Sequence, residues 1–190
     1  MLVSFEGIDG AGKTTLVRIV EQLLSADGFS TVVVAQPGDS SAGREIKESF
    51  LSGTRLEPLM EFGLLLIDRS IMDIERVRPA LAKGSIVLAD RYWHSHVYQA
   101  LAGLDLSHMI RVNRVAFPAP VLTFWIDTPV EVALRRAESR SETANTLIGS
   151  SIKALYGSLF DQGEMYRLDG LRSASELANI VVDEIGRCIP

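Results

Sequence analysis

The chain reads Met1-Leu2-Val3-Ser4-Phe5-Glu6 and then Gly7-Ile8-Asp9-Gly10-Ala11-Gly12-Lys13-Thr14. The second stretch has the spacing of a phosphate-binding loop (P-loop), and the apolar start and the helical pattern after it supply the strand-then-helix setting that such loops require. Glycines let backbone N–H groups turn toward phosphate oxygens, and the positive end of the following helix points at the same place. An ordinary glycine-rich turn is the alternative, but such a turn would not explain why the glycines, Lys13 and the Thr14 hydroxyl have this spacing. The sequence therefore predicts a protein that binds a nucleoside triphosphate.

Three residues at the end of this loop have separate expected roles. Lys13 adds a mobile positive charge, and Thr15 can add a donor at the helix N-terminus. The Thr14 hydroxyl is the expected ligand of a Mg²⁺ ion that bridges the terminal phosphates. The ATP-binding residues that we expect are Gly7, Ile8, Asp9, Gly10, Ala11, Gly12, Lys13, Thr14 and Thr15.

The bulk composition suits one domain, and we take residues 1–190 as a single unit with an apolar share, 47%, that is ample for a buried core. The net charge of -5 argues against nonspecific attraction to nucleic acid, so we expect no nucleic-acid partner. Cys188 is the one cysteine, so no intrachain disulfide can form. No apolar run approaches the roughly 20 residues that cross a bilayer. We therefore expect a cytoplasmic protein with no membrane partner.

Apolar segments and helical patterns alternate along the chain. Strands are predicted at 1–6, 31–35, 85–90, 121–127 and 165–169. Helices are predicted at 13–26, 43–52, 57–78, 105–116, 129–138, 149–161 and 173–187, whereas 92–102 has no clear pattern. Such alternation favours a parallel sheet that helices cover on both faces. The expected fold class is a three-layer α/β domain.

The helix predicted at 57–78 has two distinct sides. One side carries an apolar stripe, at spacings of three and four, that we expect to meet the core: Met60, Leu64, Ile67, Ile71 and Ile74. The opposite side carries Phe62, Leu65, Arg69, Met72 and Arg76. That side either lines a cleft or is a solvated face with a few apolar residues.

A second polar cluster follows a predicted buried strand. Ser85-Ile86-Val87-Leu88-Ala89 leads into Asp90-Arg91-Tyr92, which places a carboxylate and a guanidinium at the carboxyl end of the strand. Ligands gather at that edge in open α/β sheets. Asp90 can hold the Mg²⁺ ion or its water, and Arg91 can bind the phosphate that receives the transferred group. A structural ion pair is the alternative.

In these motifs the chain resembles the thymidylate kinase family of nucleoside monophosphate kinases. The resemblance rests on Phe5-Glu6 and the P-loop through Thr15, Pro37-Gly38, Asp68-Arg69, Asp90-Arg91-Tyr92 with Ser95, and Ile126-Asp127 before an arginine-bearing segment. It implies the P-loop kinase fold, a five-stranded parallel sheet flanked by helices, commonly as a homodimer. The implied reaction is Mg²⁺-dependent transfer of the ATP γ-phosphoryl group to a deoxynucleoside monophosphate. We expect dTMP as the acceptor and dTDP as the product.

The resemblance also implies how the acceptor nucleotide is bound. Asp9 would lie at its sugar and phosphate region and Arg91 on its phosphate, while Arg69 would reach a base oxygen. The family stacks a phenylalanine on thymine where this chain has Leu65; Phe62, one helical turn earlier, can substitute, or a leucine-lined pocket can accept a different base or sugar. The substrate-binding residues that we expect are Asp9, Pro37, Phe62, Leu65, Arg69, Arg91, Ser95, Tyr98 and Gln99.

The segment after Ser95 departs from the family pattern. The family often has a tyrosine four residues after this serine, whereas here Tyr98 follows it by three residues and Gln99 by four. Either Gln99 replaces the aromatic residue or the backbone shifts. Tyr98 can exclude a ribose 2′-OH by crowding, or it can be a partly buried helix aromatic.

Phosphoryl transfer also needs positive charge near the oxygens that change partners. Some thymidylate kinases carry an arginine inside the P-loop, where this chain has Gly10, and others place arginines in a lid that closes over ATP. We expect a lid at 136–150 that carries Arg136 and Arg140, although the later Asp-Arg pair of the family is absent. A solvated basic helix end is the alternative. The expected catalytic residues are Lys13, Asp9, Arg91, Arg136 and Arg140, and the expected metal ligands are Thr14 and Asp90.

Other P-loop classes fit the sequence less well. A GTPase switch would carry an Asn-Lys-x-Asp sequence for guanine, which this chain lacks. A transporter-type ATPase would carry a second acid directly after Asp90, where Arg91 stands. Two alternatives remain: a kinase of another deoxynucleoside or modified nucleotide, and a noncatalytic nucleotide-binding protein, which the arginine-poor lid would favour.

Overall fold

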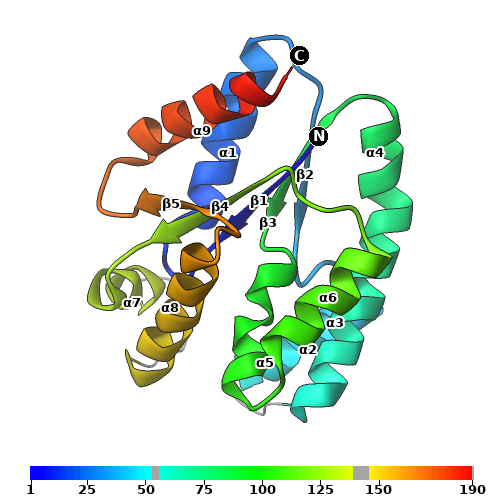
Figure 1. The fold of residues 1–190 in the computed structure, drawn as a ribbon, viewed down its shortest axis with the longest axis vertical. Helices are drawn as coiled ribbons and strands as arrows, with labels where there is room; N and C mark the ends of the chain where they lie inside the picture. The colour runs from blue at the N-terminus through cyan, green and yellow to red at the C-terminus, as the bar shows by residue number, and fades with distance from the viewer. Residues whose placement is uncertain (53–55, 139–145, 190) are drawn as a thin grey trace.

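The structure, a computed structural model, describes residues 1–52, 56–138 and 146–189. Its centre is one parallel sheet made of β1 (Leu2–Glu6), β2 (Thr31–Ala35), β3 (Ile86–Asp90), β4 (Leu122–Asp127) and β5 (Tyr166–Asp169). The strand order is β2-β3-β1-β4-β5, so β1 lies in the middle (Figure 1). The predicted α/β P-loop kinase fold with a five-stranded parallel sheet is confirmed.

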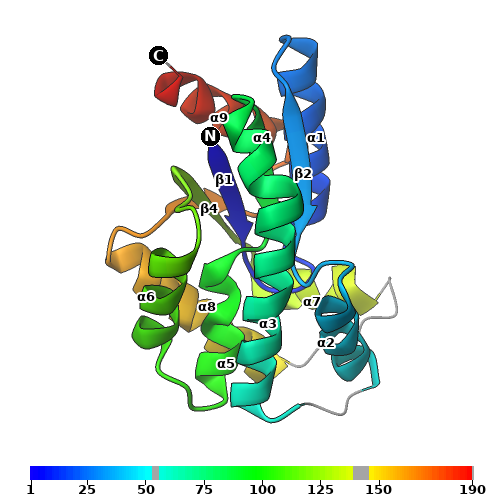
Figure 2. The same ribbon diagram turned by 90° about the vertical axis from the view of Figure 1, so that its right-hand side faces the viewer.

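Helices flank this sheet on both faces (Figures 1 and 2). α1 (Lys13–Ala26) and α9 (Ala174–Cys188) lie side by side on one face, and α4 (Arg78–Ala82) packs against β3 on the other. Further helical segments are α2 (Ser41–Ser52), α3 (Pro58–Met72), the π-helix η1 (Asp73–Val77), the 3₁₀-helix η2 (Trp93–His96), α5 (Val97–Leu101), α6 (Leu106–Ala116), α7 (Val130–Glu138) and α8 (Thr146–Asp161). No helix in the described ranges has both the length and the apolar composition that a membrane crossing needs.

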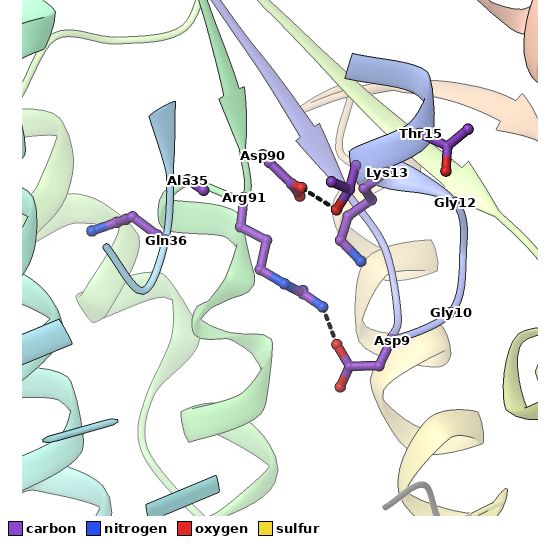
Figure 3. Close-up of a pocket in the computed structure, with 10 residues that line it drawn as sticks. Asp9, Gly10, Gly12, Lys13, Thr15, Ala35, Gln36, Asp90 and Arg91 are labelled. Carbon is purple, nitrogen blue, oxygen red and sulfur yellow. Dashed lines mark hydrogen bonds and ion pairs between the residues drawn. The ribbon is translucent and has the colours of Figure 1, made fainter. Parts of the chain in front are cut away.

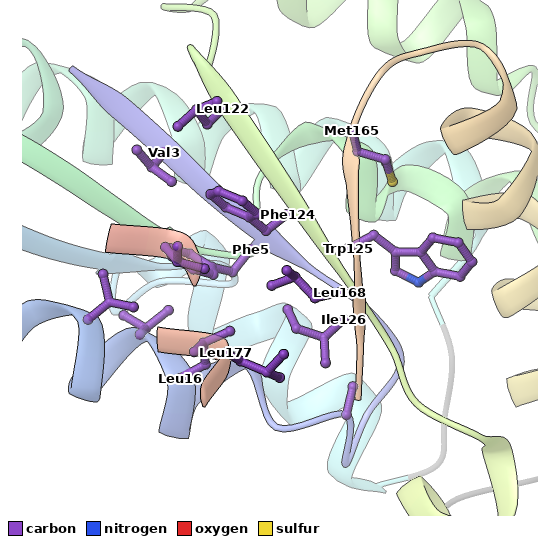
Figure 4. Close-up of a cluster of buried hydrophobic side chains, with 14 of the residues drawn as sticks. Val3, Phe5, Leu16, Leu122, Phe124, Trp125, Ile126, Met165, Leu168 and Leu177 are labelled. Atoms are coloured by element: carbon purple, nitrogen blue, oxygen red, sulfur yellow. The ribbon is translucent and has the colours of Figure 1, made fainter. Parts of the chain in front are cut away.

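Neighbouring residues of the central strands point to opposite faces, and both faces are buried. Val3 and Phe5 of β1 join the larger core cluster with α1 and α9 (Figure 4), whereas Leu2 joins a smaller cluster with η1 and α4. This double burial explains why the strands read as nearly continuous apolar runs. The strand register pairs Phe5 with Asp90. The P-loop therefore begins beside the carboxyl end of β3.

The segment predicted as one helix at 57–78 differs in extent. α3 ends at Met72, η1 follows, and α4 continues to Ala82. Asp73, the first residue of η1, is buried and accepts a hydrogen bond from Arg78 Nε at 2.6 Å. Pro79 lies in the first turn of α4, where a missing N–H costs little. The predicted end at 78 is too early because the helical path continues past Pro79 to Ala82.

The prediction that an apolar stripe of this segment meets the core is wrong. Met60, Ile67 and Ile74 are 58%, 53% and 69% exposed. The opposite side of α3 is buried, and it carries Phe62, Leu65, Asp68, Arg69 and Met72. Charged groups are tolerated there because side chains from other elements hydrogen-bond to them. Hydrophobic periodicity alone cannot detect such partners, so it assigned the wrong face to the core.

Candidate active site

The P-loop connects β1 to α1, and its glycines have conformations and neighbours that other residues would not tolerate. Gly7, Gly10 and Gly12 adopt φ angles of 147°, 76° and 104°. A Cβ atom at Gly10 would lie 2.0 Å from the carbonyl oxygen of Ala133 in α7. The start of α7 therefore packs directly onto the P-loop, in the space that a side chain at position 10 would need.

The Lys13 ammonium is buried at the centre of the loop. It donates to the carbonyl oxygens of Gly7 and Ile8 at 3.0 and 2.8 Å. Burial lowers the pKa of Lys13 to about 8, the nearby Arg91 guanidinium acts in the same direction, and carboxylates including that of Asp9 oppose the shift. Lys13 is still mostly protonated at pH 7, so it can neutralise phosphate charge.

An open cavity of about 150 Å³ lies beside the P-loop (Figure 3). The residues that line it are Asp9, Gly10, Gly12, Lys13, Thr14, Thr15, Ala35, Gln36, Asp90 and Arg91. They come from the P-loop, the end of β2 and the end of β3, which meet at one edge of the sheet. Of the predicted ATP-binding residues, Gly7, Ile8 and Ala11 are buried and do not line this cavity.

Thr14 and Asp90, the two predicted metal ligands, lie in contact at this cavity. The Thr14 hydroxyl donates to Asp90 Oδ2 at 2.5 Å (Figure 3). Hydroxyl and carboxylate oxygens are ligands that Mg²⁺ prefers, and the ion commonly takes only one or two protein ligands beside phosphates and waters. The chemistry of this pair therefore fits a Mg²⁺ ion held next to bound phosphates.

Arg91 does not pair with its neighbour Asp90 but crosses to the P-loop. Its Nη2 donates to Asp9 Oδ1 in an ion pair, and its Nη1 donates to the Gly7 carbonyl oxygen at 2.9 Å. Burial would raise the pKa of Asp9, but Arg91 and Lys13 more than offset it, so the pKa lies below its usual value. Arg91 has a φ of 70°, a left-handed conformation that costs a residue with a side chain about 1–3 kcal/mol. This backbone geometry directs the guanidinium into the cavity.

Tyr98 of α5 completes the cluster around Arg91. The guanidinium lies 5.2 Å from the centre of the Tyr98 ring, and the hydroxyl donates to Asp9 Oδ2 at 3.4 Å. Burial raises the pKa of Tyr98, so the hydroxyl stays protonated at neutral pH. Gln99 is buried and hydrogen-bonds to His96 instead. Tyr98, and not Gln99, is therefore the residue of this segment that reaches the P-loop.

Arg69 lies at the centre of a buried polar network that joins α3, η2 and α6. It is 1% exposed, its Nε donates to Gln36 Oε1 at 2.7 Å, and its Nη1 donates to Asn113 Oδ1 and, at 3.2 Å, to His96 Nε2. Burial lowers the pKa of Arg69 to about 10, which leaves it charged at pH 7. Burial and the Arg69 charge hold the pKa of His96 well below its usual value. His96 is therefore neutral, and its Nδ1–H donates to Gln99 Oε1.

The predicted base-pocket residues border this network. Phe62 packs edge-on against His96 with 4.9 Å between ring centres. Leu65 lies on the same side of α3 and is 8% exposed. The structure thus brings Phe62, Leu65 and Arg69 together, and it excludes the alternative that this side of the helix is a solvated face.

Asp68 holds the loop that follows β2. Its carboxylate accepts from the Gly38 N–H at 2.8 Å and from the Ser40 hydroxyl at 2.5 Å. A Cβ atom at Gly43 of α2 would lie 2.5 Å from Asp68 Oδ1, so α2 packs closely on the same carboxylate. Pro37, a predicted substrate-binding residue, lies in this loop between two residues that Asp68 binds, Gln36 and Gly38.

A second cavity, of about 410 Å³, opens beside the P-loop. Its lining residues are Gly10, Ala11, Gly12, Thr15, Leu16, Ile126, Arg136, Gly170, Arg172, Ala174 and Leu177. A capping box between Ser173 and Glu176 begins α9 and so fixes one wall. Of the two predicted lid arginines, Arg136 of α7 lies here, with its Nη1 3.9 Å from the position that a Cβ would take at Gly12. Arg140, together with 139–145 of the predicted lid, lies outside the described residues.

Sequence reasoning missed several residues of these sites. Asn113 gave no local signal, because its partner Arg69 is 44 residues away. Arg172, in the second cavity, stands in a polar loop with no distinctive pattern. Glu6 was named only as part of the family motif and was given no role, although a charged residue at the end of a buried strand needs hydrogen-bond partners.

Comparisons with known proteins place this geometry in a family. A family profile described as Thymidylate kinase matches residues 5–181. The chain is 41% identical over 143 residues to the probable thymidylate kinase of Archaeoglobus fulgidus, covering 75% of this chain and 71% of that protein. It is 40% identical over 146 residues to the thymidylate kinase of Xanthomonas campestris pv. campestris, with coverage of 76% and 63%. The thymidylate kinase of Caldanaerobacter subterraneus is 37% identical over 143 residues, 73% of this chain and 69% of that protein. Since the profile spans most of the chain and includes the P-loop, the Asp90-Arg91 turn and the Arg69 network, the chain belongs to the thymidylate kinase family.

Proposed function

We propose that the protein transfers the γ-phosphoryl group of ATP to dTMP and releases ADP and dTDP. The observation that carries this proposal is the cavity that P-loop residues and Arg91 share (Figure 3). Donor phosphates on the P-loop and an acceptor phosphate on Arg91 would meet in that one space. Membership in a phosphotransferase family, with relatives named thymidylate kinase, supports dTMP as the acceptor.

On the donor side, residues 7–15 would bind the phosphates of ATP through backbone N–H groups and the Lys13 ammonium. Thr14 and Asp90 would hold Mg²⁺, which supplies positive charge that offsets the charge of the phosphates. The base of ATP would occupy the second cavity, whose lining includes Gly170 and Leu177. These contacts would orient the γ-phosphate toward Arg91.

On the acceptor side, Arg91 would bind the phosphate of dTMP, and Asp9 would accept a hydrogen bond from the sugar. The Tyr98 ring would crowd a ribose 2′-OH and so favour deoxyribose. The base would lie against Leu65 and Phe62, with the Arg69 network at its polar edge. The acceptor phosphate is already anionic, so alignment and charge stabilisation can supply the catalysis without a general base.

A lid at 136–150 would complete the site. Arg136 already borders the second cavity, close to Gly12. From there its guanidinium can stabilise charge that develops on the transferred group. Arg140 would assist it. Closure of such a segment would also exclude water and limit wasteful ATP hydrolysis.

We also propose that two copies of the protein associate through the exposed stripe of α3 and η1. Leu59, Met60, Ile67 and Ile74 are 63%, 58%, 53% and 69% exposed along one helical segment. A second copy would remove these exposed apolar side chains from water.

The single cysteine of the chain suits a reducing compartment, and we place the activity in the cytoplasm.

The test is product formation from ATP and Mg²⁺ with a panel of deoxynucleoside monophosphates and thymidine, resolved by chromatography. Selective formation of dTDP is the expected result, and a folded Lys13→Ala variant should form none. Preferred turnover of another acceptor would overturn the assignment of dTMP. Binding of ATP without turnover of any acceptor would instead favour a noncatalytic nucleotide-binding protein.

A further inference from the structure

Glu6 is a buried carboxylate to which the roles above give no part. It is the last residue of β1 and is 0% exposed. Its Oε1 accepts from the backbone N–H of Tyr92 at 2.8 Å, and its Oε2 accepts from the hydroxyls of Ser95 at 2.6 Å and Tyr156 at 3.1 Å. Burying a carboxylate is costly unless several donors compensate it. The donors here come from the turn after β3, from η2 and from α8, so one side chain ties three segments to the end of the central strand.

Two of these partners flank Arg91. Tyr92 follows it in the chain, and the Ser95 hydroxyl accepts from Arg91 Nη1 at 3.4 Å. Arg91 keeps its left-handed φ of 70° only if the surroundings enforce it. The hydrogen bond from Tyr92 to Glu6 fixes the peptide unit directly after Arg91 and so opposes relaxation of that backbone. Glu6 thus holds both the backbone of Arg91 and a contact of its guanidinium.

Tyr156 anchors the same carboxylate in α8. It is 0% exposed, its ring stacks on Trp125 with 6.3 Å between ring centres, and its hydroxyl lies 3.3 Å from Ser95 Oγ. Burial and the Glu6 charge raise the pKa of Tyr156 well above its usual value. The hydroxyl therefore remains a hydrogen-bond donor at any pH at which the protein would be assayed.

We propose that Glu6 is a positioning residue that holds Arg91 in the orientation that binds the acceptor phosphate, with Tyr156 as its anchor in α8. The inference rests on the proposed function, because it requires Arg91 to bind the acceptor. Glu6 acts through Tyr92 and Ser95 and touches neither substrate. Its loss should therefore change the handling of the acceptor and leave ATP binding nearly intact.

Glu6→Gln tests this role because it keeps the size of the side chain and an acceptor for the Tyr92 N–H but removes the charge. We expect the KM for dTMP to rise about tenfold, which is the effect of weakening one or two hydrogen bonds to a charged group. The KM for ATP should stay within about twofold. Tyr156→Phe, which keeps the ring on Trp125, should raise the KM for dTMP in the same direction by a smaller factor.

Ser4→Ala is the matched control. Ser4 lies two residues before Glu6 on the same strand, is buried, and shares a hydrogen bond of 2.9 Å with Thr123 Oγ1, away from Arg91. This variant should lower the melting temperature without changing the KM for dTMP. It thereby separates general loss of stability from a loss that is specific to the acceptor.

An unchanged KM for dTMP in folded Glu6→Gln, or equal rises in the KM for dTMP and ATP, overturns the inference and leaves the proposed function standing. If Glu6→Gln does not fold, Tyr156→Phe decides, and an unchanged KM for dTMP again overturns the inference. If the unmodified protein turns over no dTMP, the proposed function fails, and the positioning role fails with it.

Discussion

Replacing Gly10 by alanine tests how closely α7 packs onto the P-loop. Gly10 has a φ of 76°, and a Cβ there would lie 2.0 Å from the carbonyl oxygen and 2.7 Å from the carbonyl carbon of Ala133. These are backbone atoms, so no side-chain rotation can relieve the overlap. The left-handed backbone costs an alanine about 1 kcal/mol, and overpacking adds about 1–3 kcal/mol. The free energy of unfolding should therefore fall by about 2–4 kcal/mol.

Gly84→Ala is the matched control for this variant. Gly84, in the turn before β3, has a φ of 77°, and nothing lies within 4 Å of the position of its Cβ. It should lose only the backbone term of about 1 kcal/mol. Urea denaturation of both variants and the unmodified protein gives the difference, about 1–3 kcal/mol, that belongs to the contact with Ala133.

A second readout follows from the position of Arg136 on α7. A P-loop that pushes α7 away also moves Arg136, so Gly10→Ala should lower kcat for phosphoryl transfer, whereas Gly84→Ala should leave it unchanged. Equal losses of stability in the two variants, with kcat preserved in both, would refute the argument that α7 is packed against the loop at this point.

Three further measurements test separate parts of the site. Lys13 has a pKa of about 8 and must be protonated to bind phosphate, so kcat/KM for ATP should fall as the pH rises through about 8. Lys13→Arg should move that decline to higher pH. A profile flat to pH 10 would argue against phosphate binding by Lys13. Asp90→Asn should raise the Mg²⁺ concentration needed for half-maximal rate about tenfold, and a superimposable Mg²⁺ titration would remove Asp90 from the metal site. Ile67→Glu should convert a dimer to a monomer in analytical ultracentrifugation, since it places a charge in the exposed stripe of α3; sedimentation identical to the unmodified protein would count against that interface.

Local patterns were sufficient to predict the elements that local chemistry determines. The bounds predicted for α1, 13–26, are those observed, because the P-loop sets where the helix begins and Gly28, with its φ of 85°, ends it. Asp90 and Arg91 were expected at the end of a buried strand, and they lie there. Thr14 and Asp90 were expected to share a metal ion, and Asp9 and Arg91 a substrate, but their direct hydrogen bonds, across 76 and 82 residues, depend on the sheet register and could not be predicted.

The acceptor side shows why the rest could not be predicted. Arg69 is buried because Gln36, which precedes α3 in the chain, and Asn113, which follows it, supply acceptors for its guanidinium. A prediction from hydrophobic periodicity considers each helix alone and assigns its most apolar stripe to the core. Here that stripe, with Ile67 at its centre, faces outward, and the buried side of α3 combines apolar residues with the charged Asp68 and Arg69.

Because β1 is the middle strand of the sheet, the strands that border the first cavity lie on one side of it and those that border the second lie on the other. β2 and β3, on one side of β1, lead to Gln36 and Arg91 at the first cavity, whereas β4 and β5, on the other side, lead to Ile126 and Gly170 at the second. Mutations of residues that line one cavity alone leave the lining of the other unchanged, whereas Gly10, Gly12 and Thr15 line both cavities. If the proposed sites are correct, a chain built this way can evolve, or be engineered, toward new acceptors through positions such as Leu65 while it retains the proposed ATP site.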